Sequence, residues 1–393
     1  MEQQQFISLL SSAVQNKVSD IHMTAGSPPA FRLLGDLVNV KLPALTEADM
    51  VQIISWCIVD KTILQTINDI QDYDGSFEVK NLCRFRYNIF RHRNKIGAIL
   101  RIISANIPSI DQLGLPKILK SISERARGLI LVTGTTGSGK SSTLAAMIDH
   151  INNTSSAHIL TVEDPIEFVH NQKKSRITQR ELGRDTRTFA GALRSALRQD
   201  PDVILVGEMR DPETIDIALK AAETGHLVFS TVHTTDAIRT IGRLISVFPP
   251  TEQKMVRLRL ADNLVSTISQ RLVKRADGKG MVAAQEIMIT NPAIAECIAN
   301  PDLTGAMNEF IEKSRNIIAG KITGGQTFDM HLTDLYIAKI ITAETALEAS
   351  SNPADFERSL LLAKAGVGGT SLNGSSKADL GIQLDRKSEP VEK

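Results

Sequence analysis

Apolar residues in the first hundred positions switch between helical and strand spacing. Residues 4–18 repeat apolar side chains at helical intervals, and so do residues 46–70. Short apolar runs between turn residues predict a strand pair within 31–40, turned at Gly35 and Asp36, and strands at 75–79, 84–92 and 97–103. We therefore expect a mixed α+β domain over residues 1–105, followed by a linker at 106–112.

From residue 113 the pattern changes to apolar strands that alternate with helical segments. The strands are predicted in LILVTG and at residues 158–163, 202–208 and 226–233. Strands separated by helices favour a parallel sheet with helices on both faces. Beyond residue 250 the pattern is mostly helical, which gives an α/β domain with a helical C-terminal region over residues 113–355. The composition of residues 366–393 favours disorder.

Composition narrows the functional classes. The chain has 393 residues with 45 Lys and Arg against 44 Asp and Glu, so its net charge is +1. This balance gives no indication of nucleic-acid binding. Cys57, Cys83 and Cys297 lie too far apart for a zinc or disulfide spacing. No leader and no apolar run long enough to span a bilayer are visible, so we expect a soluble cytoplasmic protein without membrane insertion.

The segment GLILVTGTTGSGKS at residues 128–141 is the strongest chemical signal. Gly134, Gly139, Lys140 and Ser141 satisfy the phosphate-loop pattern G-x-x-x-x-G-K-[ST] between an apolar strand and a helical repeat. Backbone N–H groups of such a loop surround phosphates, the lysine reaches the β- and γ-phosphates, and the serine hydroxyl holds Mg²⁺. A glycine-rich turn that binds nothing is the alternative, but the flanking strand and helix argue against it. The predicted ATP-binding set is Gly134, Thr135, Thr136, Gly137, Ser138, Gly139, Lys140, Ser141 and Ser142.

Acidic residues end two of the predicted parallel strands. Glu163 and Asp164 follow the strand at 158–163, where a carboxylate can polarise an attacking water, although a helix-capping role remains an alternative. Glu208 ends a second strand and fits a magnesium-binding acid, with Gly207 where many such strands carry aspartate. His233 ends a third strand, where it either senses the γ-phosphate or donates a structural hydrogen bond.

The first domain is rich in arginine near its end. Arg86 and Arg101 lie on adjacent predicted strands, so both side chains can point into one cleft. A solvated basic surface is one interpretation. The other is that these guanidinium groups neutralise charge on the γ-phosphate from across a domain boundary.

Taken together, these motifs resemble the secretion-ATPase superfamily, and within it most closely the PilT family of type IV pilus retraction ATPases. The resemblance covers about residues 1–355. It is carried by SDIHMTAGSPP, GTTGSGKSST, ILTVEDPIEFVH, LRSALRQDPDVILVGEMRD and TGHLVFSTVHTTDA, in that order.

This resemblance implies a PAS-like N-terminal domain, a RecA-like ATPase domain and a homohexameric ring that uses ATP and Mg²⁺ to drive pilus retraction and twitching motility. It also implies that Glu163 is the catalytic base, that Glu208 completes the metal site, that Arg86 and Arg101 contact the γ-phosphate and that His233 senses it. The implied partners are an inner-membrane pilus platform protein and a second pilus ATPase, with the ring at the base of the pilus machine and no nucleic acid bound.

Two features refine the comparison within the superfamily. Extension-type and type II secretion ATPases usually carry an extra N-terminal domain and a four-cysteine zinc module, which this sequence does not provide. Retraction motors typically carry an A-I-R-N-L-I-R-like segment, but residues 293–300 read AIAECIAN and lack both arginines. An accessory or paralogous pilus ATPase therefore stays open as an alternative, as do a ring DNA translocase and a regulatory nucleotide-binding scaffold.

Overall fold

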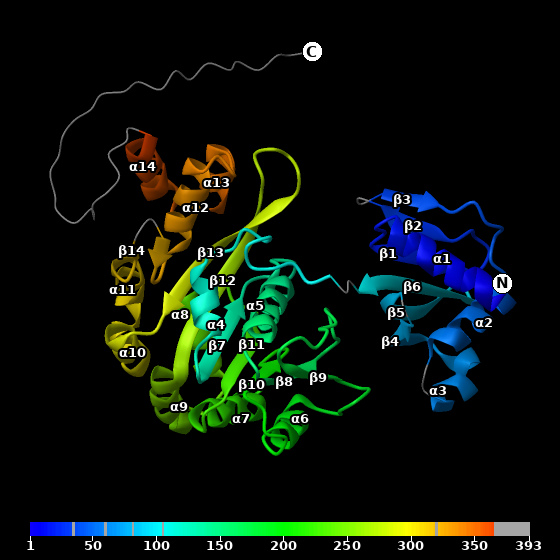
Figure 1. Ribbon diagram of the computed structural model, residues 1–393, viewed down its shortest axis with the longest axis horizontal. Coiled ribbons are helices and arrows are strands. Elements are labelled where there is room, and N and C mark those ends of the chain that lie inside the picture. Colours follow the sequence, from blue (N-terminus) through cyan, green and yellow to red (C-terminus); the bar gives the residue numbers. More distant parts are fainter. Residues whose placement is uncertain (34–35, 59–60, 81, 104–105, 319–320, 365–393) are drawn as a thin grey trace, which may run out of the picture.

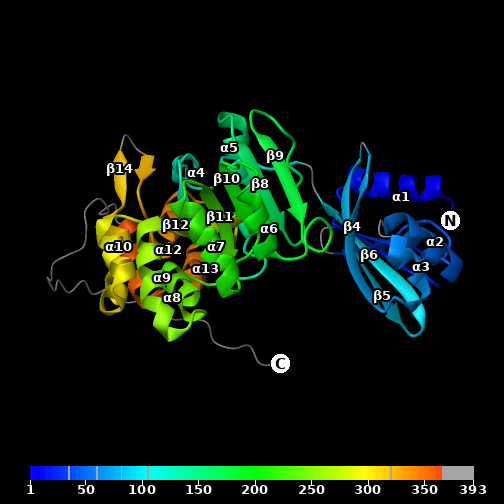
Figure 2. The same ribbon diagram turned by 90° about the horizontal axis from the view of Figure 1, so that it is seen from below.

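The computed structural model describes residues 1–33, 36–58, 61–80, 82–103, 106–318 and 321–364. Gly35 of the predicted turn, the proposed boundary at residue 105 and the tail at 366–393 lie outside the described residues. Figures 1 and 2 show the described chain as two lobes, a smaller N-terminal one in blue to cyan and a larger one in cyan to orange. Each lobe is built around its own sheet.

The N-terminal lobe is a six-stranded antiparallel sheet with helices packed on one face. The strand order is β3-β2-β1-β6-β5-β4. Its elements are α1 (Gln3–Gln15), β1 (Asp20–Thr24), β2 (Ala30–Leu33), β3 (Asp36–Asn39), α2 (Glu47–Cys57), α3 (Lys61–Gln65), η1 (Ile67–Asp69), β4 (Asp72–Val79), β5 (Cys83–His92) and β6 (Lys95–Ile103). The apolar face of α1 packs with α2 and the sheet in a single core, as its helical periodicity predicts.

The alternation of side chains along β5 determines which residues of this lobe face the larger lobe. Phe85 and Tyr87 are buried in the core, so Arg84 and Arg86 point to the opposite face of the sheet. β5 pairs with β6 in a register that places Arg86 opposite Arg101. The two arginines that the sequence singled out are therefore cross-strand neighbours.

The larger lobe is a seven-stranded sheet with the order β13-β12-β7-β11-β10-β8-β9. All neighbouring strands are parallel except the β12–β13 pair. The strands are β7 (Gly128–Thr133), β8 (His158–Glu163), β9 (Arg176–Glu181), β10 (Val203–Val206), β11 (Leu227–Val232), β12 (Leu264–Lys274) and β13 (Met281–Ile289). The helices are α4 (Ile118–Ser123), α5 (Lys140–Thr154), α6 (Phe189–Ala196), α7 (Pro212–Glu223), α8 (Ala237–Ser246), α9 (Pro250–Asn263), α10 (Pro292–Ala299), α11 (Met307–Lys313), α12 (Phe328–Ile337), α13 (Ala343–Ala349) and α14 (Pro353–Lys364). The short elements η2 (Pro301–Ala306), β14 (Asn316–Ile318) and β15 (Lys321–Thr323) complete the lobe.

Both faces of this sheet are covered, which explains the continuous apolar character of its central strands. Leu129 and Leu131 of β7 pack in the core that contains α7, α8 and α9. Ile130 and Val132 pack on the other face, with α4 and α5. Each strand therefore buries side chains alternately on both sides.

The structure departs from the sequence expectation beyond residue 250. There the pattern predicts mainly helices, but β12 and β13 form two long strands beside β7. Their buried residues run almost without interruption, so periodicity does not separate such strands from buried helix. Edge strand β9 also falls outside the predicted strands because its RITQRE sequence is polar.

Candidate nucleotide-binding site

The phosphate loop connects β7 to α5, where the sequence predicts it. Gly134, Gly137 and Gly139 all have positive φ, at 144°, 78° and 87°. A Cβ on Gly134 would lie 2.5 Å from the carbonyl oxygen of Gln270 and from Ser138 Oγ. The loop therefore needs glycine at this position for space as well as for backbone conformation.

Lys140 begins α5 and turns its side chain back into the loop. Its Nζ donates hydrogen bonds to the carbonyl oxygens of Gly134 (3.0 Å) and Thr135 (2.9 Å). Burial lowers the pKa of Lys140, and the negative charge of Glu208 partly opposes that change. The ammonium group is thus held inside the loop at the N-terminus of a helix, an arrangement that attracts phosphate.

A buried glutamine that sequence reasoning missed supports the loop from β12. Gln270 Nε2 donates to the carbonyl oxygen of Ser138 (2.6 Å), and Gln270 Oε1 accepts from Thr143 Oγ1 (2.9 Å) and Gln285 Nε2 (3.2 Å). These bonds connect the loop, α5 and the two strands that sequence reasoning did not predict. The only available signal was a polar residue within an otherwise buried apolar run.

Glu163 ends β8, which lies between β10 and β9 in the sheet. Its Oε1 accepts hydrogen bonds from Thr161 Oγ1 (2.7 Å) and from Gln179 Nε2 (3.1 Å). Burial raises the pKa of Glu163 above the ordinary value of 4.5, whereas these two hydrogen bonds lower it. A fixed carboxylate with an elevated pKa suits a general base.

This geometry predicts a pH dependence. A base must be ionised, so we expect kcat to fall on acidification at a pH above 4.5, because burial raises the pKa of Glu163. Replacing Gln179 with leucine removes a hydrogen bond that lowers this pKa, so the acidic limb should move to higher pH. The pH profile of phosphate release measures this shift, and Gln199→Leu, at an exposed glutamine, is the control. An unmoved limb in Gln179→Leu would contradict the assignment.

Glu208 follows β10 and lies beside the neighbouring strand end. Its carboxylate contacts Arg210 Nε at 2.6 Å and lies 3.5 Å from Nε2 of His233, the residue after β11. A Cβ on Gly207 would lie 3.3 Å from Glu163 Cα, so glycine lets β8 and β10 approach closely there. The structure thus brings Glu208 and His233 together. His226, which precedes β11 at its other end, contacts the carbonyl oxygen of Ala221 through Nδ1.

Arg86 and Arg101 lie side by side but take different partners. Arg86 Nη1 is 3.9 Å from Oε1 of Glu167 in the larger lobe, whereas Arg101 Nε is 2.8 Å from Asp20 Oδ1 in its own lobe. Among the residues that the structure describes, neither guanidinium group bonds to the phosphate loop. Their contact with a γ-phosphate therefore stays a prediction.

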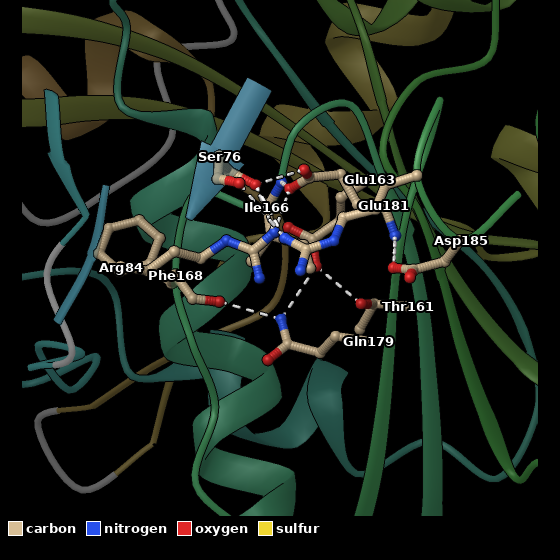
Figure 3. A network of polar contacts seen from close by, with 10 residues as sticks. Ser76, Arg84, Thr161, Glu163, Ile166, Phe168, Gln179, Glu181 and Asp185 are labelled. Carbon is tan, nitrogen blue, oxygen red and sulfur yellow. Dashed lines mark hydrogen bonds and ion pairs between the residues drawn. The ribbon is translucent and has the colours of Figure 1, made fainter. Parts of the chain in front are cut away.

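A third arginine, Arg84, forms a buried ion pair between the lobes (Figure 3). Its Nη2 is 2.7 Å from Oε2 of Glu181, and the two side chains are only 12% and 6% exposed. Ser76 Oγ donates to Glu181 Oε1 at 2.7 Å and accepts from Arg84 Nη2 at 2.8 Å. The sequence pointed to the arginines of this lobe in general but gave no signal for the Glu181 partner.

Residues 293–300, which depart from the retraction-motor pattern, form most of α10. Ile294, Cys297 and Ile298 are buried in the core of the larger lobe. Arg257 of α9 donates to the carbonyl oxygen of Ile298 at 3.2 Å. The helix is therefore formed and packed despite the altered sequence.

None of the helices in the described residues has the length and apolar character that crossing a bilayer requires. No group of three or more histidine, cysteine or acidic side chains gathers in this part of the chain as a metal site would.

Comparisons with known proteins agree with this geometry. The profile of the type II/IV secretion system protein family matches residues 3–319. The chain is 47% identical over 348 residues to the type IV pilus retraction ATPase PilT of Pseudomonas aeruginosa, covering 88% of this chain and 98% of that protein. It is 45% identical over 348 residues to a twitching motility protein of Neisseria gonorrhoeae, covering 88% and 90%.

A solved structure matches the whole fold. The crystal structure of the pilus retraction motor PilT with bound ADP superimposes with a TM-score of 0.81 at 44% identity, covering 91% of this chain and 99% of that one. The predicted fold class, an α+β N-terminal domain followed by an α/β ATPase domain, is confirmed by this match, and the structure adds that the N-terminal sheet is antiparallel.

Proposed function

The chain belongs to the type II/IV secretion system protein family, and from that premise we propose that it is a PilT-like motor that hydrolyses ATP to retract type IV pili and drive twitching motility. The observation that carries the proposal is the phosphate loop with Lys140 held inside it, in a chain that matches a retraction motor along nearly its full length. The phosphate loop supports ATP hydrolysis, and the similarity to pilus retraction and twitching motility proteins supports the pilus as the structure on which the motor acts.

The residues around the loop support one hydrolytic step. Loop N–H groups and Lys140 bind the β- and γ-phosphates. Glu163 accepts a proton from water as the water oxygen attacks the γ-phosphorus and the bond to the bridging oxygen breaks, which releases ADP and phosphate. We propose that His233, whose Nε2 lies 3.5 Å from Glu208 Oε2, hydrogen-bonds a γ-phosphate oxygen.

Magnesium fits this set of residues. Ser141 would supply a hydroxyl from the first turn of α5, and Glu208 would supply a carboxylate. Mg²⁺ usually takes only one or two carboxylates from a protein, and phosphates and waters provide its other ligands. Bound there, the ion would neutralise charge on the β- and γ-phosphates.

Movement would come from the arginines of the N-terminal lobe. Arg86 already faces the acidic segment that follows β8, through Glu167. We propose that Arg86 and Arg101 contact the γ-phosphate when ATP draws the lobes together. Loss of that phosphate removes the differential affinity that favours the closed state, so the lobes reopen.

The family also supports a multi-subunit arrangement. We propose a homohexameric ring, since a closed ring repeats one heterologous interface around an axis. Its proposed partners are an inner-membrane pilus platform protein and a second pilus ATPase. Its proposed place is the cytoplasmic side of the pilus base, with no nucleic acid bound.

A deletion strain tests the function. We expect loss of the gene to raise surface piliation while twitching motility falls, because pili are still assembled but no longer withdrawn. The wild-type gene and the exposed-site variant Lys174→Ala should restore motility, whereas Lys140→Ala should not. Surface pili are quantified by shearing and motility by the twitching zone. Normal twitching in the deletion strain would count against a retraction role.

A further inference from the structure

One face of β9 clamps the segment that follows the proposed base. Gln179 and Glu181 are two residues apart on this strand, so their side chains share a face. Gln179 Nε2 donates both to Glu163 Oε1 (3.1 Å) and to the carbonyl oxygen of Phe168 (2.9 Å). Glu181 Oε2 accepts the backbone N–H of Ile166 at 3.1 Å. Figure 3 shows both side chains reaching this segment.

Backbone contacts complete the clamp around Glu163. β8 and β9 pair in a register that places Glu163 opposite Glu181, and Leu182 N–H donates to the carbonyl oxygen of Glu163 at 2.8 Å. Asp185 Oδ2 accepts the backbone N–H of Glu181 at 2.8 Å. The Glu181 carboxylate thus contacts the chain just after Glu163, at Ile166, and the backbone next to Glu181 bonds to Glu163 itself.

The same carboxylate is also the anchor of the N-terminal lobe. Its two oxygens accept from Ser76 Oγ and from Arg84 Nη2, both at 2.7 Å. Oε2 is shared between Arg84 and the Ile166 N–H. Arg84 comes from β5 and Ser76 from β4, so two strands of one lobe converge on a single acidic side chain of the other.

We propose that Glu181 is a positioning residue that couples docking of the N-terminal lobe to the alignment of Glu163 for ATP hydrolysis. This inference rests on the proposed function, because it assumes that Glu163 is the base. Glu181 need not touch the nucleotide. It acts through Ile166 and the backbone of the segment that carries Glu163.

The coupling follows from the burial of the ion pair. With the lobe docked, Arg84 neutralises Glu181 where little water reaches either group. When the lobe departs, Ser76 and Arg84 leave together, and Glu181 becomes a carboxylate that must find new partners. The Arg86–Glu167 contact on the same segment is lost in the same movement. Residues 164–168 then lose the contacts that come from the N-terminal lobe, while Gln179 still holds Phe168 and Glu163. As the Glu181 carboxylate turns to new partners it shifts Ile166, and the base moves away from its hydrolytic position.

This device has a consequence for a ring motor. A subunit with its N-terminal lobe docked hydrolyses ATP, whereas a subunit with the lobe displaced retains nucleotide without cleaving it. Docking of the N-terminal lobe then determines when each subunit hydrolyses ATP, and this sets the order in which the subunits turn over.

The experiment measures phosphate release and ADP affinity in the full-length chain. Glu181→Gln keeps the size of the side chain but removes the charge, and Arg84→Ala removes its partner. We expect kcat to fall about 10- to 100-fold in both, because displacing a reacting group by about 1 Å costs that much. Arg84→Lys keeps the positive charge and should recover part of the loss. Lys80→Ala, at an exposed site of the same lobe, should match the wild type.

Three outcomes would overturn the proposal. The first is an unchanged kcat in Glu181→Gln and Arg84→Ala. The second is an ADP affinity that falls as much as kcat, since a positioning defect leaves binding intact. The third concerns Ser76→Ala, which removes the hydrogen bonds of Ser76 Oγ to Glu181 and from Arg84 but keeps the ion pair. This variant serves as the test if Glu181→Gln has a lowered melting temperature. An unchanged kcat in that variant counts equally against coupling.

A double variant separates this inference from the proposed function. If Glu181 acts through Glu163, then Glu163→Gln/Glu181→Gln should hydrolyse ATP no more slowly than Glu163→Gln alone. A further loss in the double variant refutes the coupling while the base assignment stands. Normal turnover in Glu163→Gln alone refutes the base assignment itself.

Discussion

Replacing Lys140 with alanine is expected to abolish ATP hydrolysis and to weaken nucleotide binding by about 10- to 100-fold, the usual worth of a hydrogen bond to a charged group. The ammonium group is held by the carbonyl oxygens of Gly134 and Thr135 inside the loop, and alanine removes its charge from that place. Titration with a fluorescent nucleotide measures affinity, and phosphate release measures turnover.

Stability separates this chemical effect from misfolding. Burial lowers the pKa of Lys140, which means that the charged form is desolvated in the folded protein. Alanine removes that cost and suits the first turn of a helix, so the melting temperature should not fall. Lys174→Ala, at an exposed lysine of the same lobe, is the matched control. Turnover by Lys140→Ala at the wild-type rate would eliminate the loop as the hydrolytic site.

Replacing Glu163 with glutamine should lower kcat by about 10²- to 10⁴-fold, the range attributed to general-base catalysis. Glutamine retains an oxygen that can accept from Thr161 and Gln179, so the local structure should persist. Nucleotide affinity should stay near that of the wild type, because Glu163 acts on the attacking water. Single-turnover phosphate release and ADP titration together separate the two effects.

The stability of this variant has an expected sign. Because burial raises the pKa of Glu163, the ionised carboxylate costs folding free energy at neutral pH, and a neutral glutamine avoids that cost. Glu163→Gln should therefore melt no earlier than the wild type at pH 7. Glu252→Gln, at an exposed acid of α9, is the control. A normal kcat in Glu163→Gln would contradict the assignment of Glu163 as the base and would favour the alternative, a helix-capping role.

Apolar periodicity predicted most of the fold where one face of an element is buried. Helix α1 and the strands within residues 72–103 appear where the pattern placed them, because their apolar residues face a single core. Prediction failed for β12 and β13, because their residues are buried almost throughout and polar and apolar positions therefore do not alternate along them. It also failed for β9, a polar edge strand.

The sequence by itself determined the nucleotide chemistry of this protein. Residues 134–142 are contiguous, so the glycines, Lys140 and Ser141 need only a strand before them and a helix after them to form a phosphate site. Tertiary structure alone decided how the two lobes meet and what holds Glu163. Arg84 and Glu181 are 97 positions apart, and Gln179 and Glu163 are 16 apart. No local pattern links such residues, because their contacts exist only once folding has paired β8 with β9 and has docked the lobe that carries β5 against them.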